Sequence, residues 1–300
     1  MSTAVEEATR APSPVELAAA YAHCARVART HYENFTIGSW LLPRRLRHDL
    51  AALYAFARGA DDIADEGEPL GGPSNRIVRL RAWEEKLVAS ARDPAAADDP
   101  VFLALGHTIA THALPLDPFR DLLEAFRRDA AGETRRFATF ADLLGYCRRS
   151  ANPVGRLVLA LFGHRDAARQ SHADDICTAL QLTNFWQDVA GDLDRGRVYL
   201  PDEDLERFSG SRDALAARRP NAAFRGLLAF EVARTRALFE RGLPLADMVG
   251  RRLRREVRIF ARGGLAILGR IEAVDYDVFR RRPTLGRAEL LRLVVRGLWR

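Results

Sequence analysis

The spacing of apolar residues is the feature that most limits the fold of this chain. Along nearly all of its 300 residues they recur every three or four positions, and a convincing alternation of period two is missing. This pattern is typical of amphipathic helices. The sequence therefore predicts an all-α protein. Its helices are expected at about 14–31, 43–66, 75–93, 99–112, 117–132, 139–163, 168–193, 203–217, 221–240, 251–273 and 286–298.

The domain organisation follows from the segments between these helices. Breaks such as GGP at 71–73 and GHRD at 163–166 separate helical patterns, but no internal repeat, low-complexity linker or composition shift marks a domain boundary. The first residues, MSTAVEEATRAPSP, are acidic and lack the apolar core of a secretory signal. We expect residues 1–13 to be a disordered lead-in and residues 14–300 to form one helical domain.

Composition narrows the class of protein. Hydrophobic residues make up 48% and charged residues 29%, as in ordinary globular proteins, and no apolar run is long enough to cross a bilayer. Cys24, Cys147 and Cys177 lie in apolar helical contexts and match no zinc spacing. Free thiols in a reducing compartment fit best, so we expect a cytoplasmic protein.

The net charge of +6 is carried mostly by arginines after position 195, as in GRRLRREVRIFARGG. Such an excess suits nucleic acid, an anionic membrane or a phosphorylated ligand. Aromatic residues are not interleaved with the arginines, so we expect no nucleic-acid partner. The terminal segment ELLRLVVRGLWR is basic and amphipathic. It could contact the inner face of a membrane, but docking on the bundle as a last helix is the favoured interpretation.

Two polar ribbons run along helices that are otherwise apolar. The first, on the helix at 43–66, consists of Tyr54, Arg58, Asp61 and Asp65. The second, on the helix at 168–193, consists of Gln181, Asn184, Asp188 and Asp192. At about 100° per residue, each ribbon covers at most about 80° of its helix.

Each ribbon places one aspartate four residues before another, and this spacing has two interpretations. A single charged stripe is usually a solvated surface. Here, however, like charges at i,i+4 destabilise the helix twice, and aspartate is a mediocre helix former. Mg²⁺ would remove the repulsion, because it prefers carboxylate oxygens and bridges them to phosphates. We therefore expect the two aspartate pairs to face each other across a slot that binds Mg²⁺ and a diphosphate.

The residues around both ribbons resemble the squalene/phytoene synthase family of head-to-head prenyl transferases. The resemblance covers about residues 31–277 and rests on LLPRRLRHDLAALYAFARGADDIADE, FADLLGYCRRSANPVGRL, QLTNFWQDVAGDLDRGRVYLP and IEAVDYDV. It implies an isoprenoid-synthase helical bundle with a central apolar cavity. It also implies a prenyl diphosphate substrate, either presqualene diphosphate or farnesyl diphosphate.

Within the family, several positions resemble the bacterial hydroxysqualene synthase branch. Gln187 stands where relatives usually have arginine, Ala151-Asn152-Pro153 replaces Ala-Gly-Thr, and the chain reads ENF, SWLLP and NFWQDV. That branch converts presqualene diphosphate and water to hydroxysqualene for hopanoid and squalene biosynthesis, with Mg²⁺ and without NADPH. The alternatives are condensation of two prenyl diphosphates, as in presqualene diphosphate or phytoene synthesis, and a non-catalytic helical subunit. The sequence also does not decide whether the protein binds other enzymes of its pathway.

The resemblance implies a role for each ribbon residue and its neighbours. Asp61, Asp65, Asp188 and Asp192 would bind Mg²⁺. Gln181, Asn184, Tyr54 and Arg58 would orient the diphosphate, its metal-bound water or the acidic cluster, and Gln187 would shape the phosphate end. Substrate contacts are expected from His31, Phe35, Ala151, Val154, Gly155, Phe185, Arg195 and Arg197, and Tyr146 is a further aromatic candidate. His31 is equally well explained as a histidine without a ligand.

Overall fold

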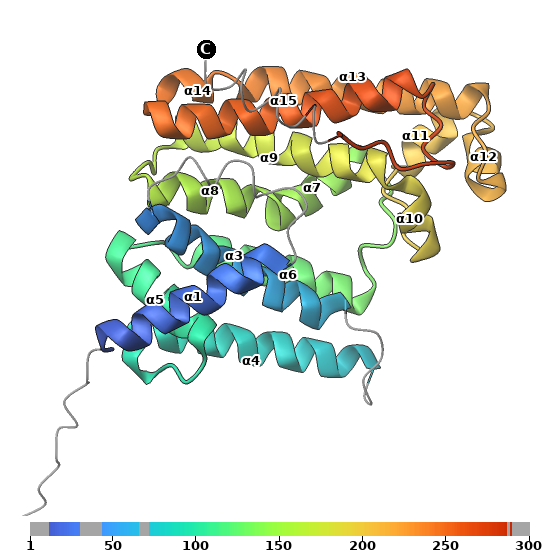
Figure 1. Ribbon diagram of the computed structural model, residues 1–300. Helices are drawn as coiled ribbons and strands as arrows, with labels where there is room; N and C mark the ends of the chain where they lie inside the picture. Colours follow the sequence, from blue (N-terminus) through green and yellow to red (C-terminus); the bar gives the residue numbers. More distant parts are fainter. Residues whose placement is uncertain (1–11, 31–43, 66–71, 287–288, 290–300) are drawn as a thin grey trace, which may run out of the picture. The chain divides into compact units, whose positions relative to one another are not determined.

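The computed structural model describes residues 12–30, 44–65, 72–286 and 289. Regular structure within these ranges is helical, apart from an isolated bridge between Arg136 and Val198 (Figure 1). The prediction of an all-α protein is therefore confirmed. The contacts divide the chain into two compact units, residues 1–131 and 132–300. The expectation of one domain over 14–300 stays a prediction, and the lead-in at 1–11 lies outside the described residues.

The first unit contains the helices α1 (Pro14–Thr30), α3 (Arg44–Asp65), α4 (Gly72–Arg92), α5 (Pro100–His112) and α6 (Asp117–Ala131), with a short 3₁₀ turn at Pro94–Ala96. Its core is aromatic. The fully buried Phe56 of α3 meets Phe102 and Phe119 edge to face, with ring centroids 6.1 Å and 5.4 Å away. Burial of such a side chain contributes about 1.5–3 kcal/mol, so α3 is held firmly in this unit.

A buried polar cluster fixes the other end of α3. The hydroxyl of Tyr21 in α1 lies 2.9 Å from Thr108 Oγ1 and 3.3 Å from Asp49 Oδ1. The second carboxylate oxygen of Asp49 lies 3.0 Å from His112 Nε2. These bonds satisfy polar groups that would otherwise be costly to bury. These bonds connect α1, α3 and α5 near the N-terminal end of α3. The first ribbon lies at the C-terminal end of the same helix, which is therefore well anchored.

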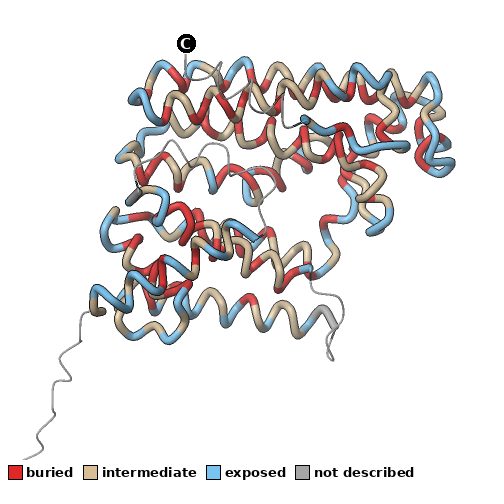
Figure 2. Tube along the Cα trace, in the orientation of Figure 1, coloured by how far each residue is buried: buried red, intermediate tan, exposed pale blue. Residues whose placement is uncertain are grey.

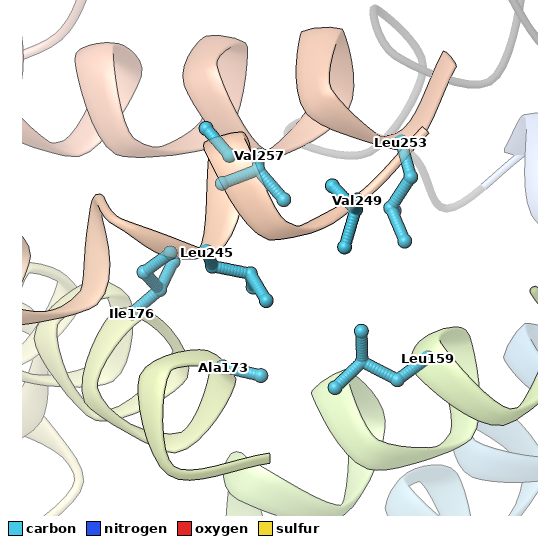
Figure 3. Close-up of a cluster of buried hydrophobic side chains, with 8 residues drawn as sticks. Leu159, Ala173, Ile176, Leu245, Val249, Leu253 and Val257 are labelled. Atoms are coloured by element: carbon cyan, nitrogen blue, oxygen red, sulfur yellow. The ribbon is translucent and has the colours of Figure 1, made fainter. Parts of the chain in front are cut away.

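The second unit is built around α9 (Ala167–Gln187), which packs against α8 (Asn152–Leu161), α13 (Ala222–Gly242) and α15 (Arg251–Ala273). Its other helices are α7 (Phe140–Ser150), α10 (Val189–Asp194), α11 (Asp202–Arg207), α12 (Ser211–Ala217) and α14 (Leu245–Met248). Figure 3 shows apolar side chains from α8, α9, the α14 region and α15 pointing toward one another. In Figure 2, buried and exposed positions alternate along the helices, as the periodicity predicts.

Trp186 joins α9 to α13 in this unit. Its side chain is fully buried, and its indole Nε1 donates to Thr235 Oγ1 at 2.8 Å. The Thr235 hydroxyl in turn donates to the carbonyl of Glu231 at 2.7 Å. A buried indole that keeps its hydrogen bond stabilises the packing without leaving an unpaired donor. Trp186 thereby fixes the end of α9 that carries the second ribbon.

Three predicted helices are wrong in extent. The helix at 139–163 breaks at Ala151, because Pro153 lacks an N–H donor and restricts the residue before it. The helix at 168–193 breaks at Asp188, and the helix at 203–217 is divided near Gly210, whose φ of 93° is outside the helical region. The short α14 was not predicted, and the helix at 286–298 falls almost entirely outside the described residues.

Two other expectations from composition can be compared with the described helices. None of these helices combines the length and apolarity required to cross a bilayer. Cys24, Cys147 and Cys177 are all free thiols, as expected, with Cys24 and Cys147 buried. Burial raises the pKa of the Cys147 thiol to about 12, so this thiol remains neutral and inert at physiological pH.

Candidate functional site

The first ribbon lies on the last three turns of α3. Tyr54, Arg58 and Asp61 are half-buried there, and Asp65 is exposed at the helix end. The guanidinium of Arg58 donates to Asp61 Oδ2 at 3.1 Å, and its other terminal nitrogen lies 2.5 Å from Asp62 Oδ1. Asp62, which is not part of the ribbon, is therefore a second partner of Arg58. Arg58 thus holds the acidic end of α3 in place.

The electrostatics of this ribbon disfavour a fully ionised acid pair. Burial raises the pKa of Asp61 to about 6, with the neighbouring Asp65 adding to the effect and Arg58 opposing it. Burial also raises the pKa of Tyr54, against the opposing effect of Arg58. The Nε of Arg58 is buried and has no hydrogen-bond partner among the described residues. The ribbon therefore offers acids whose charge a cation would stabilise, beside an unused donor suited to an anion.

The second ribbon lies where α9 ends and α10 begins. Asp188 adopts φ −106° and ψ 13°, in the sparsely populated bridge region that many active-site residues occupy. Hydrogen bonds continue on both sides of it, from Asp188 N to Asn184 O and from Asp192 N to Asp188 O, each at 2.9 Å. Asp192 is buried, and its pKa is raised to about 6 by burial and by Asp188. In each ribbon, the negative charge of one aspartate therefore hinders the ionisation of the other: Asp65 acts on Asp61, and Asp188 acts on Asp192.

Arg282 is a site residue that the sequence did not reveal. Its guanidinium pairs with Asp188 through two nitrogens, with Nη2 2.8 Å from Oδ2 and Nε contacting Oδ1. The segment that carries it is attached by Gln187, whose Nε2 donates to the carbonyl of Pro283. The run RRRP at 280–283 was a visible signal, but helical periodicity cannot relate residues 94 positions apart. Gln187 was expected to shape the phosphate end of the site. Its observed contact is with the segment that supplies a cation there.

The remaining residues of this end of the second unit surround Asp192. The backbone N–H groups of Arg195 and Arg197 donate to its carbonyl at 3.0 Å and 2.8 Å. The Arg195 side chain is exposed, that of Arg197 is half-buried, and both arginines oppose the rise in the Asp192 pKa. Gln181 and Asn184 are half-buried on the preceding turns of α9. The structure therefore gathers all four second-ribbon residues and both arginines at one end of the unit.

An aromatic wall lies next to Asp192. Phe185 stacks on Tyr199 with ring centroids 3.8 Å apart and planes 8° apart, and Tyr146 stacks at 6.3 Å from each. A small pocket beside these rings is lined by Phe185, Asp192, Arg197, Tyr199 and five apolar neighbours. Phe185 and Tyr146 were predicted as aromatic contacts. Tyr199 was missed as a site residue, although it lies in the RGRVYLP motif.

The segment after Ala151 has a packing role that the sequence reasoning did not anticipate. Ala151 and Pro153 are buried, whereas Val154 is 36% exposed. Gly155 lets α8 approach α9 closely, since a Cβ there would lie 2.6 Å from the Sγ of Cys177. Small size at Gly155 is thus explained within the unit, and the substrate contacts of this segment stay predictions. His31 and Phe35 lie outside the described residues.

The residues present fit a magnesium–diphosphate site of the expected kind. Among the described residues, no set of three or more His, Cys, Asp or Glu side chains is gathered as metal ligands. The acids come instead in pairs, one in each unit, and Mg²⁺ commonly binds one or two carboxylates together with substrate phosphates. Arg58 and Arg282 add donors for the anion. That the two pairs face each other stays a prediction.

Comparisons with known proteins agree with the sequence motifs. The family model described as Squalene/phytoene synthase matches residues 11–289. A 15-cis-phytoene synthase of Synechococcus elongatus is 31% identical, covering 89% of this chain and 88% of that protein. A hydroxysqualene synthase of Rhodopseudomonas palustris is 33% identical, covering 74% of this chain and 73% of that one.

A solved structure gives the highest identity of these comparisons. The squalene synthase HpnC from Alicyclobacillus acidocaldarius is 43% identical, with a TM-score of 0.81, and covers 88% of this chain and 97% of that one. A dehydrosqualene synthase solved with a ligand is 25% identical with a TM-score of 0.84, covering 95% of this chain and 97% of that one. Family model, relatives and fold agree, and the chain belongs to the squalene/phytoene synthase family.

Proposed function

We propose that this protein converts presqualene diphosphate and water to hydroxysqualene and diphosphate, with Mg²⁺ and without NADPH. Enzymes of the family act on prenyl diphosphates, so the substrate class follows from membership. The squalene-forming branch is supported by the 43% identity to a protein named squalene synthase HpnC over 88% of the chain, and the hydroxysqualene product by the relative named hydroxysqualene synthase, at 33% identity. The identity to HpnC exceeds the identities of 31% and 34% to two phytoene synthases. Gln187 and the Ala151–Pro153 segment support the same branch.

The chain's residues would divide the work of removing the diphosphate. Asp61, Asp65, Asp188 and Asp192 would hold Mg²⁺, which when bound supplies positive charge against the leaving group. Arg58 would donate its unused Nε–H to a diphosphate oxygen, because a charge-assisted bond would satisfy that buried donor. Arg282, released from Asp188, would supply a second guanidinium to the anion.

The apolar part of the site would protect the carbocation that remains. The stacked rings of Phe185, Tyr199 and Tyr146 offer faces that stabilise a cation by about 0.5–2 kcal/mol each without reacting with it. They also exclude bulk water, so that a single admitted water forms the alcohol. Gln187 acts at a distance, because its bond to Pro283 holds the segment that carries Arg282.

Condensation of two prenyl diphosphates is the second candidate. It is favoured by the phytoene synthase relatives, one of which is 34% identical over 241 residues. The same aspartates and arginines would serve that reaction, because it too begins with loss of a diphosphate. The residues that fix the diphosphate do not distinguish the two reactions.

Product analysis separates the candidates. Purified protein with Mg²⁺ would be incubated with presqualene diphosphate or with farnesyl diphosphate, in water enriched in oxygen-18. We expect presqualene diphosphate to give an alcohol that carries the heavy oxygen, with no requirement for NADPH. Consumption of farnesyl diphosphate alone would refute the assignment in favour of condensation. If neither substrate reacts and calorimetry detects no Mg²⁺-dependent binding of pyrophosphate, the protein is a non-catalytic subunit.

A further inference from the structure

Two buried acids of the second unit share one arginine. Arg234, on α13, donates from Nε to Oε2 of Glu231 at 2.7 Å and from Nη2 to Oε1 at 2.5 Å. The same Nη2 donates to Oδ2 of Asp204, on α11, at 2.7 Å. Glu231 is fully buried and Asp204 is 4% exposed. If both acids were ionised, this Arg234 cluster would hold an uncompensated negative charge away from water, which is costly.

A proton removes this surplus charge. Burial raises the pKa of Glu231 to about 8, Arg234 opposes the rise, and both the charge of Asp204 and a hydrogen bond with Asp204 add to it. A hydrogen bond between two carboxyl groups requires that one of them is protonated, because ionised carboxylates only accept. Below about pH 8 the Arg234 cluster therefore contains one proton shared by two acids, and it is electrically neutral.

Other charged groups on the helices around α13 belong to separate contacts. The ion pairs are Asp175–Arg241 between α9 and α13, Glu272–Arg236 between α15 and α13, and Arg212–Asp202 between α12 and α11. Arg207 of α11 lies over the ring of Phe230, 4.7 Å from its centroid. Arg234 and Asp204 are therefore the charged groups that act most strongly on Glu231.

The Arg234 cluster also holds the first residues of α7 and α11 against α13. The guanidinium carbon of Arg234 lies 3.4 Å from the centroid of the Phe140 ring, at the start of α7. Glu203, next to Asp204, accepts a hydrogen bond from the Phe140 N–H at 2.7 Å. Tyr146 and Tyr199 of the aromatic wall are only six and five residues from Phe140 and Asp204.

Backbone hydrogen bonds connect these points to the rings of the aromatic wall. The N–H of Asp202 donates to the carbonyl of Phe137 at 2.9 Å, and the N–H of Glu203 donates to the carbonyl of Ala138 at 3.0 Å. The ring of Phe137 lies 5.5 Å from that of Tyr146 and 5.9 Å from that of Tyr199. A displacement of α11 from α13 would therefore move residues that pack directly on the wall.

We propose that Arg234, Glu231 and Asp204 are positioning residues for the aromatic wall, and that the proton shared by the two acids keeps α11 on α13. The inference rests on the proposed function, in which the wall shields a carbocation from bulk water. Because the pKa of Glu231 is raised, the proton is lost to solvent as the pH rises through about 8. Two carboxylates then repel each other around one guanidinium, and the wall loses its support.

Fluorine NMR of the ligand-free protein tests the shared proton without turnover. With 4-fluorophenylalanine incorporated, the Phe185 signal reports on the ring stacked 3.8 Å from Tyr199, and Phe185→Leu assigns it. In the wild type we expect this signal to shift with a midpoint near pH 8. In Glu231→Gln the signal should stay fixed around that pH, because the amide still donates to Asp204 but does not titrate. The control Glu240→Gln, the same change at an exposed position of α13, should behave as the wild type.

Product analysis with presqualene diphosphate tests the link to the wall. Arg234→Lys keeps the charge but loses the planar fork that binds both acids and stacks on Phe140. We expect the share of the alcohol among the products to fall at least about threefold, because water and side reactions are no longer excluded. The control Arg236→Lys, which changes the pair with Glu272 on the same helix, should give the wild-type product share.

Each outcome decides a stated part of the proposal. A Phe185 signal that stays fixed in the wild type, or that shifts equally in Glu231→Gln, would overturn the shared proton. A lower melting temperature of Arg234→Lys with the wild-type product share would overturn the positioning role. If Arg234→Lys does not fold, the fluorine comparison of wild type and Glu231→Gln still decides. If the wild type forms no alcohol, the proposed function fails, whereas the fluorine result stands by itself.

Discussion

Replacing Asp192 by asparagine should stabilise the protein in the absence of Mg²⁺. The folded state raises the pKa of Asp192 from 3.8 to about 6, mainly through burial and the charge of Asp188. A raised pKa means that the folded protein binds the proton more tightly than the unfolded chain does. Ionised Asp192 therefore destabilises the fold. The effect is absent below about pH 4, grows between about pH 4 and 6, and is constant above that.

The size of this effect follows from the shift. About two pKa units correspond to about 3 kcal/mol at pH 8, since each unit is about 1.4 kcal/mol. This net shift already includes the opposing attraction of Arg195, Arg197 and Arg282, so we expect asparagine to give a gain of up to about 3 kcal/mol. For a chain of 300 residues, whose unfolding entropy is about 0.6 kcal/mol/K, that raises the melting temperature by up to about 5 °C.

Thermal unfolding from pH 3.5 to 8 measures this prediction. The matched control is Asp194→Asn, which removes an exposed acid paired with Arg218 at 2.5 Å and should leave the melting temperature unchanged or slightly lower. Mg²⁺ with pyrophosphate should stabilise the wild type more than Asp192→Asn. The reasoning fails if Asp192→Asn is no more stable than wild type at pH 8, or if its advantage persists below pH 4.

Three further changes test other contacts of the site. Asp61→Asn should abolish turnover while leaving the melting temperature equal or higher. The gain in stability should be smaller than for Asp192→Asn, because the Asp61 side chain is 38% exposed. Wild-type turnover in this variant would mean that Asp61 is an ordinary surface acid. Arg282→Gln should raise the affinity for Mg²⁺ alone up to about tenfold, because it frees Asp188 from a bidentate pair. The control Arg280→Gln should leave this affinity unchanged. Equal Mg²⁺ affinities of the two variants, measured by calorimetry, would contradict the prediction. Gln187→Ala should speed hydrogen exchange over about 277–286, since its bond to Pro283 is lost, and unchanged exchange would exclude an anchoring role.

Much of the site could be predicted because helix geometry is local. The spacing of Asp61 and Asp65, and of Asp188 and Asp192, places each pair on one helix side whatever the rest of the chain does. The same regularity predicted the all-α class and most helix positions. The motifs around these residues then indicated the family.

The tertiary structure decided what periodicity cannot encode. The breaks at Ala151 and Asp188 interrupt patterns that read as continuous helices. The pairing of Arg282 with Asp188 and the bond from Gln187 to Pro283 join residues more than 90 positions apart. Such contacts depend on how helices pack and where the connecting segments return, and burial, which sets the acidity of the aspartates, exists only once that packing has formed.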